Sequence, residues 1–127
     1  MQYDIDLVSK EFRINIQDLF HLYRTYINLV QDNFSQIDTL IINSDWNMVE
    51  KLIHKIKGMS GNLRILDVYE ETKIINDLIV QNDYEKLYEK FQTLKATFSE
   101  ARKGIIKAFK DKGLETVEKE FLQTSSN

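Results

Sequence analysis

The chain has 127 residues, a net charge of −3 and 43% hydrophobic residues, as is ordinary for a single soluble globular domain. It has no cysteine, which excludes disulfides and thiolate metal sites. The slight acidity argues against general nucleic-acid binding, which favours a basic surface, so no nucleic-acid partner is expected. No apolar run exceeds three residues, and no basic stretch followed by an apolar segment opens the chain. We therefore expect no membrane span, no signal peptide and a cytoplasmic location.

Helices are predicted along most of the chain, because proline is absent and apolar residues recur at three- and four-residue steps. The pattern predicts a short first helix over Tyr3 to Phe12. A long second helix is predicted from Ile16 to about Ile42, with Asn15 as its N-cap.

A polar break at 43–45 precedes a third helix, for which Ser44 or Asp45 can serve as the cap. A second break spans 64–67, with Asp67 as a possible cap for a shorter fourth helix. A third break at 81–83 leads into a long last helix that ends near Phe109. The predicted inward-facing residues are Trp46, Val49, Ile53, Ile56, Ser60 and Leu63 on the third helix, and Val68, Thr72, Ile75 and Ile79 on the fourth.

Short polar connections favour antiparallel neighbours, so the expected fold class is all-α: an antiparallel up-down four-helix bundle with a short N-terminal helix. We assign residues 1–112 to this bundle and residues 113–127 to a C-terminal tail. Gly113 interrupts the helical pattern, Leu114 to Leu122 suits one weak extra helix, and residues 124–127 are expected to fray.

His54 has the most informative surroundings in the chain, since it is expected on the side of the third helix away from the apolar stripe. Lys57 follows at three residues, Gly58 at four and Gly61 at seven. At about 100° per residue, both glycines fall within roughly 40° of the direction of the histidine. A glycine inside a helix costs about 1 kcal/mol relative to alanine, and on this face we do not expect the two glycines to serve helix packing. Clearing space so that another protein can reach the imidazole would explain that cost.

The residues around His54 also allow simpler interpretations. A lone histidine on a polar helix face usually has no function, and His21, which no Lys-Gly pair follows, is assigned none. Two histidines on different helices do not make a zinc site. Ser60 is expected on the core side of the helix, out of reach of His54 as a base, so a nucleophilic serine is excluded.

The run His54-Lys55-Ile56-Lys57-Gly58, followed by Asn62-Leu63, resembles the signature of histidine-containing phosphotransfer (HPt) domains of two-component phosphorelays. Asp45-Trp46 resembles the family's entry into the helix that carries the histidine, and Asp83 resembles its entry into the last helix. The resemblance covers roughly residues 5 to 110. Arg64 departs from the pattern, because the family usually has a glycine there; an arginine would be strained if that position needs a positive φ.

The resemblance implies a four-helix bundle in which His54 accepts and donates a phosphoryl group. Lys57 would balance the charge of the phosphate, and Gly58 would keep the ring accessible. The implied partners are a response-regulator receiver domain and a sensor histidine kinase. The chain shows no nucleotide-binding loop, metal cluster or catalytic base, so we expect no cofactor and no kinase activity of its own. The receiver would supply the catalytic Mg²⁺ and lysine.

Partner binding is expected on the same face as His54. Lys51, Lys55, Lys57 and Arg64, against Glu50, make this face locally positive and suited to steer an acidic partner, with Gly61 as part of the contact surface. Two alternatives stay open: a non-phosphorylated adaptor that binds a receiver or a helix, and the detached phosphotransfer module of a larger histidine kinase. The initial Met1 favours a free-standing protein over an excised module.

Overall fold

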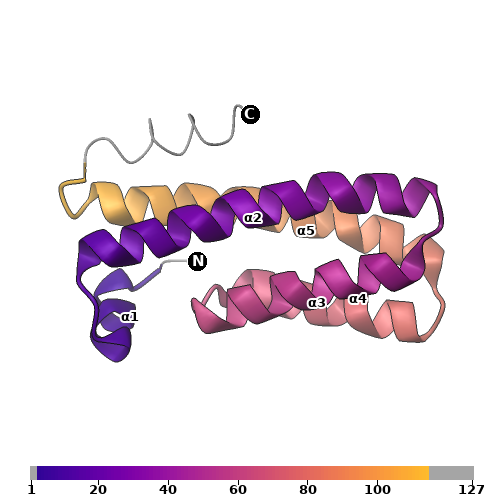
Figure 1. Ribbon diagram of the computed structural model, residues 1–127, viewed down its shortest axis with the longest axis horizontal. Helices are drawn as coiled ribbons and strands as arrows, with labels where there is room; N and C mark the ends of the chain where they lie inside the picture. Colours follow the sequence, from indigo (N-terminus) through magenta and orange to yellow (C-terminus); the bar gives the residue numbers. More distant parts are fainter. Residues whose placement is uncertain (1–2, 115–127) are drawn as a thin grey trace.

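Five α-helices make up the part of the chain that the structure, a computed structural model, describes, residues 3–114 (Figure 1). Within these residues there is no β-strand, so the all-helical prediction is confirmed. No helix among them is both long and apolar enough to cross a membrane. The helices are α1 (Ile5–Phe12), α2 (Ile16–Ile42), α3 (Trp46–Asn62), α4 (Leu66–Val80) and α5 (Tyr84–Lys110).

Capping side chains set where most of these helices begin. Asn15 and Asp83 accept hydrogen bonds from backbone N–H groups in the first turns of α2 and α5. Asp45, one of the two predicted candidates, caps α3. The first helix begins two residues later than predicted because Asp4 caps it, accepting from the N–H of Leu7.

The prediction that Asp67 caps α4 is wrong. Ile65 occupies the N-cap position and no side chain caps the helix. Arg64 adopts a left-handed φ of 64° in the turn before α4, and the Ile65 that follows it is completely buried. Asp67 lies in the first turn of α4, where its carboxylate accepts a 2.9 Å hydrogen bond from the hydroxyl of Tyr3.

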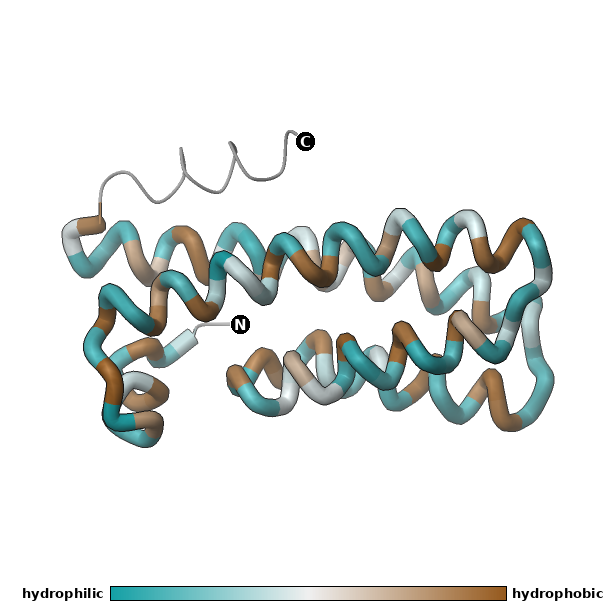
Figure 2. The backbone as a smooth tube through the Cα atoms, in the orientation of Figure 1, coloured by the Kyte–Doolittle hydropathy of each residue, from teal (hydrophilic) through white to brown (hydrophobic). Residues whose placement is uncertain are grey.

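Buried hydrophobic residues of all five helices form one core, and Figure 2 shows hydrophobic residues recurring along the helices. The long helix α2 packs against α1, α3 and α5, and α4 packs against α3 and α5. At one end of this arrangement, Trp46 and Tyr84 stack with ring centroids 4.1 Å apart, which joins the starts of α3 and α5. The predicted inward faces of α3 and α4 are confirmed, except that Trp46 is only half-buried.

The predicted tail lies almost wholly outside the described residues. Leu114, the last of them, packs against the core, and its N–H donates to the carbonyl of Phe109. The rest of the predicted weak helix and the frayed end at 124–127 fall beyond residue 114.

Candidate functional site on the outer face of α3

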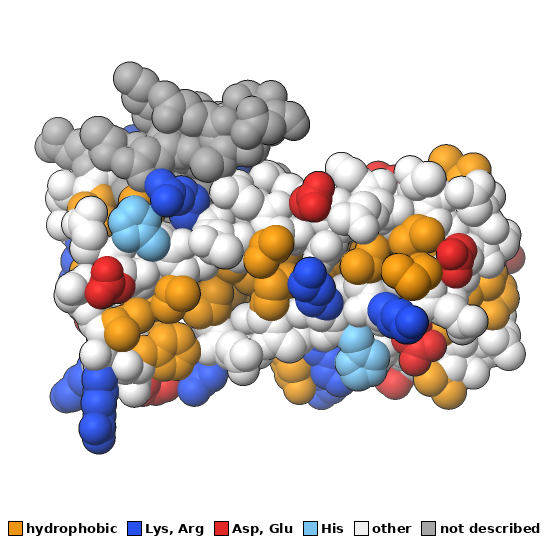
Figure 3. All heavy atoms as spheres, viewed as in Figure 1, with side chains coloured by type: hydrophobic (Ala, Val, Ile, Leu, Met, Phe, Trp, Pro, Cys, Tyr) orange, Lys and Arg blue, Asp and Glu red, His pale blue; other side chains and the backbone are white. Residues whose placement is uncertain are grey.

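The exposed imidazole of His54 is carried by a helix that is firmly packed on its other side. Ile53 and Ile56 of α3 have no exposed surface, whereas His54 and Gly58 are exposed. Figure 3 shows that both histidines of the chain reach the surface on one face of the molecule. The prediction that the histidine lies outside the core is therefore confirmed.

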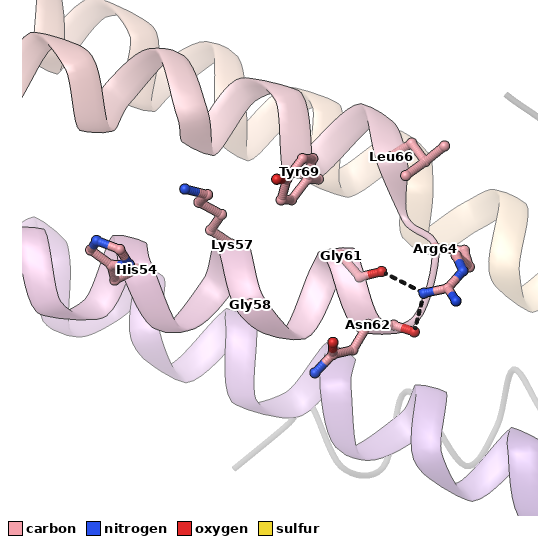
Figure 4. Close-up of a pocket in the computed structure, with 8 residues that line it drawn as sticks. All are labelled: His54, Lys57, Gly58, Gly61, Asn62, Arg64, Leu66 and Tyr69. Carbon is pink, nitrogen blue, oxygen red and sulfur yellow. Dashed lines mark hydrogen bonds between the residues drawn. The ribbon is translucent and has the colours of Figure 1, made fainter. Parts of the chain in front are cut away.

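His54 lies where two surface depressions meet. One, of about 470 Å³, runs between α3 and α4 and is lined by His54, Lys57, Gly58, Gly61, Arg64 and Tyr69, among others (Figure 4). The other, of about 440 Å³, adjoins the histidine on the N-terminal side and is lined by Asn47, Glu50 and Lys51. The ring is thus open to approach from two directions.

The two glycines beside the histidine differ in what surrounds them. A Cβ placed on Gly58 would meet nothing within 4 Å, so this position is bare surface, as predicted. A Cβ on Gly61 would lie only 3.2 Å from the ring of Tyr69 on α4. The expectation that Gly61 does not serve packing is therefore wrong, because its missing side chain makes room for an aromatic ring of the neighbouring helix.

The predicted cations lie in different places around the ring. Lys57 is half-buried, and Figure 4 shows its side chain and that of His54 on the side of α3 that faces α4. Within residues 3–114, the ammonium of Lys57 forms no ion pair. Lys51 lines the second depression, and Lys55 is exposed but lines neither of the two.

Arg64 reaches the first depression but directs its guanidinium to other groups. It donates to the carbonyls of Gly61 and Asn62 at 3.1 and 3.2 Å and forms a 3.2 Å ion pair with Glu11 of α1. The guanidinium also lies 5.8 Å from the ring centroid of Phe12. Arg64 has a positive φ, which a glycine would adopt without strain. Part of the charge of its guanidinium is balanced by Glu11.

Two tyrosines of α2 form hydrogen bonds with the C-terminal end of α3 on its buried side. The hydroxyl of Tyr23 donates to the carbonyl of Leu63 at 2.7 Å, and that of Tyr26 lies 2.8 Å from the hydroxyl of Ser60. Burial raises the pKa of Tyr23 to about 12 and also raises the pKa of Tyr26. The sequence reasoning missed these bonds, although a tyrosine inside an apolar stripe is itself a signal, because a buried hydroxyl needs a partner.

Two residues of α4 near the site were also missed. The side-chain nitrogen of Asn76 lies 3.4 Å from Nε2 of His54. The ammonium of Lys73 lies 5.6 Å from the ring centroid of Tyr69, which lines the first depression. Neither could be found from α3 alone, since both depend on how α4 packs beside it.

The chemistry available at this site is that of one nucleophilic nitrogen beside one cation. Within residues 3–114, no three His, Asp or Glu side chains gather closely enough to hold a metal ion. Comparison of the chain with protein-family models, with curated proteins and with solved structures finds no match in any of the three. A functional assignment therefore depends on the residues of the site.

Proposed function

We propose that this chain is a histidine phosphotransfer protein, in which His54 accepts a phosphoryl group and passes it to or from an aspartate of a response-regulator receiver domain. The observation that carries the proposal is the exposed imidazole of His54 between two depressions, with Lys57 beside it and unfilled space over Gly58. In the same proposal, α2 to α5 form an antiparallel up-down four-helix bundle of HPt type. The packing of α2 on α3, α3 on α4, α4 on α5 and α5 on α2 supports that arrangement.

The transfer needs little from this chain beyond a nucleophile and a nearby charge. A neutral imidazole has one ring nitrogen without a proton, whose lone pair is available for in-line attack on phosphorus. The new N–P bond forms as the P–O bond to the aspartate of the receiver breaks, and the electron pair of that bond leaves with the carboxylate. Lys57 offsets the charge of the phosphoryl oxygens, while the partner supplies the metal and most of the positioning.

The proposed partners are a receiver domain and, upstream, a sensor histidine kinase, met in the cytoplasm. Lys51, Lys55 and Arg64 would form the basic rim that steers an acidic receiver toward the ring. Gly58 would let the receiver approach, so Gly58→Leu should slow transfer without unfolding the chain.

A direct test is to incubate the protein with a phosphorylated receiver and look for acid-labile phosphate on His54. The variant His54→Gln should take up no phosphate, and His21→Gln, which alters the other exposed histidine, should label like the wild type. Uptake by His54→Gln would show that the site is wrong. A stable complex with the receiver but no label on the wild type would favour the non-phosphorylated adaptor.

Lys57 has a separate test. Lys57→Ala should slow the transfer or shorten the lifetime of the phosphohistidine without preventing its formation, because the lysine supplies charge and no covalent bond. The measurement belongs at low ionic strength, where surface electrostatics are strongest. An unchanged rate and lifetime there would remove the proposed role of this lysine.

A further inference from the structure

The side of the α2–α5 pair that faces away from α3 and α4 gathers positive charge where α5 ends. Phe109 of α5 contacts Phe20 of α2, with ring centroids 5.6 Å apart, so the first turns of α2 lie beside the last turns of α5. Arg24 follows Phe20 by one helical turn, and its guanidinium lies 5.7 Å from the centroid of that ring. We call this surface the cationic seam, and its residues are Phe20, Arg24, Asn28, Arg102, Ile106 and Lys110.

Two cations of α5 face α2, and only one of them has an acidic partner among residues 3–114. Lys95 forms a 2.8 Å ion pair with Asp38 of α2. Arg102 lies seven residues later, hence on the same side of the helix, but its Nε and Nη2 are buried and have no hydrogen-bond partner in that part of the chain. Buried donors without an acceptor are unfavourable. None of the six residues of the seam carries a carboxylate.

The turn that follows α5 reverses the chain at the end of this seam. Gly113 has a φ of 86°, and its N–H donates to the carbonyl of Lys110, while the N–H of Leu114 donates to the carbonyl of Phe109. These two bonds form a Schellman motif, which folds the residue after the glycine back onto the last turn of the helix. Leu114 accordingly packs against the core. The described part of the chain therefore ends beside Phe109, next to the cationic seam.

The sequence that follows Leu114 has the charge and the apolar spacing to cover this surface. Val117 and Phe121 follow Leu114 at three- and four-residue steps, which is the pattern of one apolar helix face. Glu118 falls on the same side of the predicted helix, between Leu114 and Phe121. Acidic residues outnumber basic ones in the segment, whose charged side chains are Glu115, Glu118, Lys119 and Glu120.

We propose that the segment 115–122 docks on the cationic seam as an amphipathic helix. Phe121 covers the half-buried Ile106, and the glutamates lie against the two arginines of the seam and Lys110. Figure 1 shows α2 and α5 along one side of the molecule and α3 and α4, which flank His54, along the other. The docked segment thus leaves the ring of His54 open, and the inference does not depend on the proposed phosphotransfer.

The test uses the absence of cysteine, which allows one spin label to be placed without ambiguity. The label is attached to Gln123→Cys, just after the segment, and the broadening of backbone amide NMR signals reports which residues lie near it. Phe121→Ser removes the apolar anchor, and Arg102→Glu reverses one charge of the seam. Lys90→Glu is the matched control, because it makes the same charge change at an exposed position earlier in α5.

The amide signals of Arg24 and Ile106 should be lost in the labelled protein, while those of Lys57 and Tyr69, between α3 and α4, should remain. Phe121→Ser and Arg102→Glu should each restore the lost signals, and Lys90→Glu should not. Equal broadening on both sides of the molecule would overturn the proposal, as would broadening of the seam that neither variant relieves. Broadening that appears only between labelled and unlabelled chains in a mixture would assign the seam to a second copy and would overturn it too.

Discussion

The two faces of α3 differ in burial: one is packed into the core and the other is exposed. The inner face buries Ile53 and Ile56 completely and is bonded to α2 through Tyr23 and Tyr26. The outer face presents His54 beside a glycine position with no neighbour within 4 Å. The adjacent residues Ile53 and His54 can therefore have different roles, because the packing of the inner face already holds the helix in place. The site face is free to carry residues that contribute nothing to stability.

The largest expected contrast between the faces is at two adjacent residues. Ile53→Ala should lower the free energy of unfolding by about 2–5 kcal/mol, because it leaves a cavity in the core. His54→Ala should change it by less than about 0.5 kcal/mol, since the exposed ring packs against little. Urea unfolding of both variants measures the difference. Similar losses in the two would show that the faces are not distinct.

The next largest effect is expected at alkaline pH, which should lower the free energy of unfolding by ionising tyrosines that bond to the inner face. Burial raises the pKa of Tyr23 to about 12, above the value of the unfolded chain, so its contribution to stability is full below about pH 10 and is lost as the pH rises through 12. Tyr26 acts in the same direction. Each tyrosine should add a slope of up to about 1.4 kcal/mol per pH unit in that window.

The measurement is urea unfolding at a series of alkaline pH values. Lysines also titrate there, so the informative comparison is with Tyr23→Phe, which cannot ionise at that position. Its stability should fall less steeply with pH than that of the wild type. Parallel curves would mean that Tyr23 ionises as easily in the folded chain as in the unfolded one.

A smaller effect is expected from one hydroxyl behind the site. Tyr26→Phe keeps the ring in the core but removes the partner of Ser60, which should cost about 1–2 kcal/mol of unfolding free energy. Tyr88→Phe, at a 55% exposed tyrosine on α5, is the control and should be nearly neutral. Equal values for the two variants would remove the stabilising role of the Tyr26–Ser60 bond.

The smallest effect separates the two glycines. Gly58→Ala should raise the free energy of unfolding by up to about 1 kcal/mol, because alanine is the better helix former and the site is empty. Gly61→Ala should gain less or lose stability, since its Cβ would lie 3.2 Å from the ring of Tyr69. Thermal unfolding of the two variants ranks them. A lower melting temperature for Gly58→Ala than for Gly61→Ala would reverse the assignment of bare and packed positions.

The sequence alone predicts those parts of the fold that depend on one helix at a time. Apolar spacing and caps such as Asn15 placed α2 at Ile16–Ile42, and the same spacing put His54 outside and Ser60 inside. These features follow from local periodicity and from backbone N–H groups that need an acceptor.

Features that depend on a second helix were predicted wrongly or missed. The sequence did not show that Tyr69 of α4 packs against Gly61. It also did not show that Asn76, 22 residues from His54, lies beside the ring of this histidine. The ion pair of Arg64 with Glu11 was also missed, because it depends on the position of α1. Asp67 is a residue type that often caps helices, yet α4 begins at Leu66, after the buried Ile65.

The stack of Trp46 on Tyr84 gives the molecule a built-in optical probe. Trp46 is the only tryptophan of the chain, and its ring lies nearly parallel to that of Tyr84, at an angle of 3°. Fluorescence excited in this one indole therefore reports the separation of the start of α3 from the start of α5. It is insensitive to fraying of α1, which lies at the opposite end (Figure 1). Unfolding followed by this emission and by far-ultraviolet circular dichroism will coincide only if both ends of the molecule come apart together.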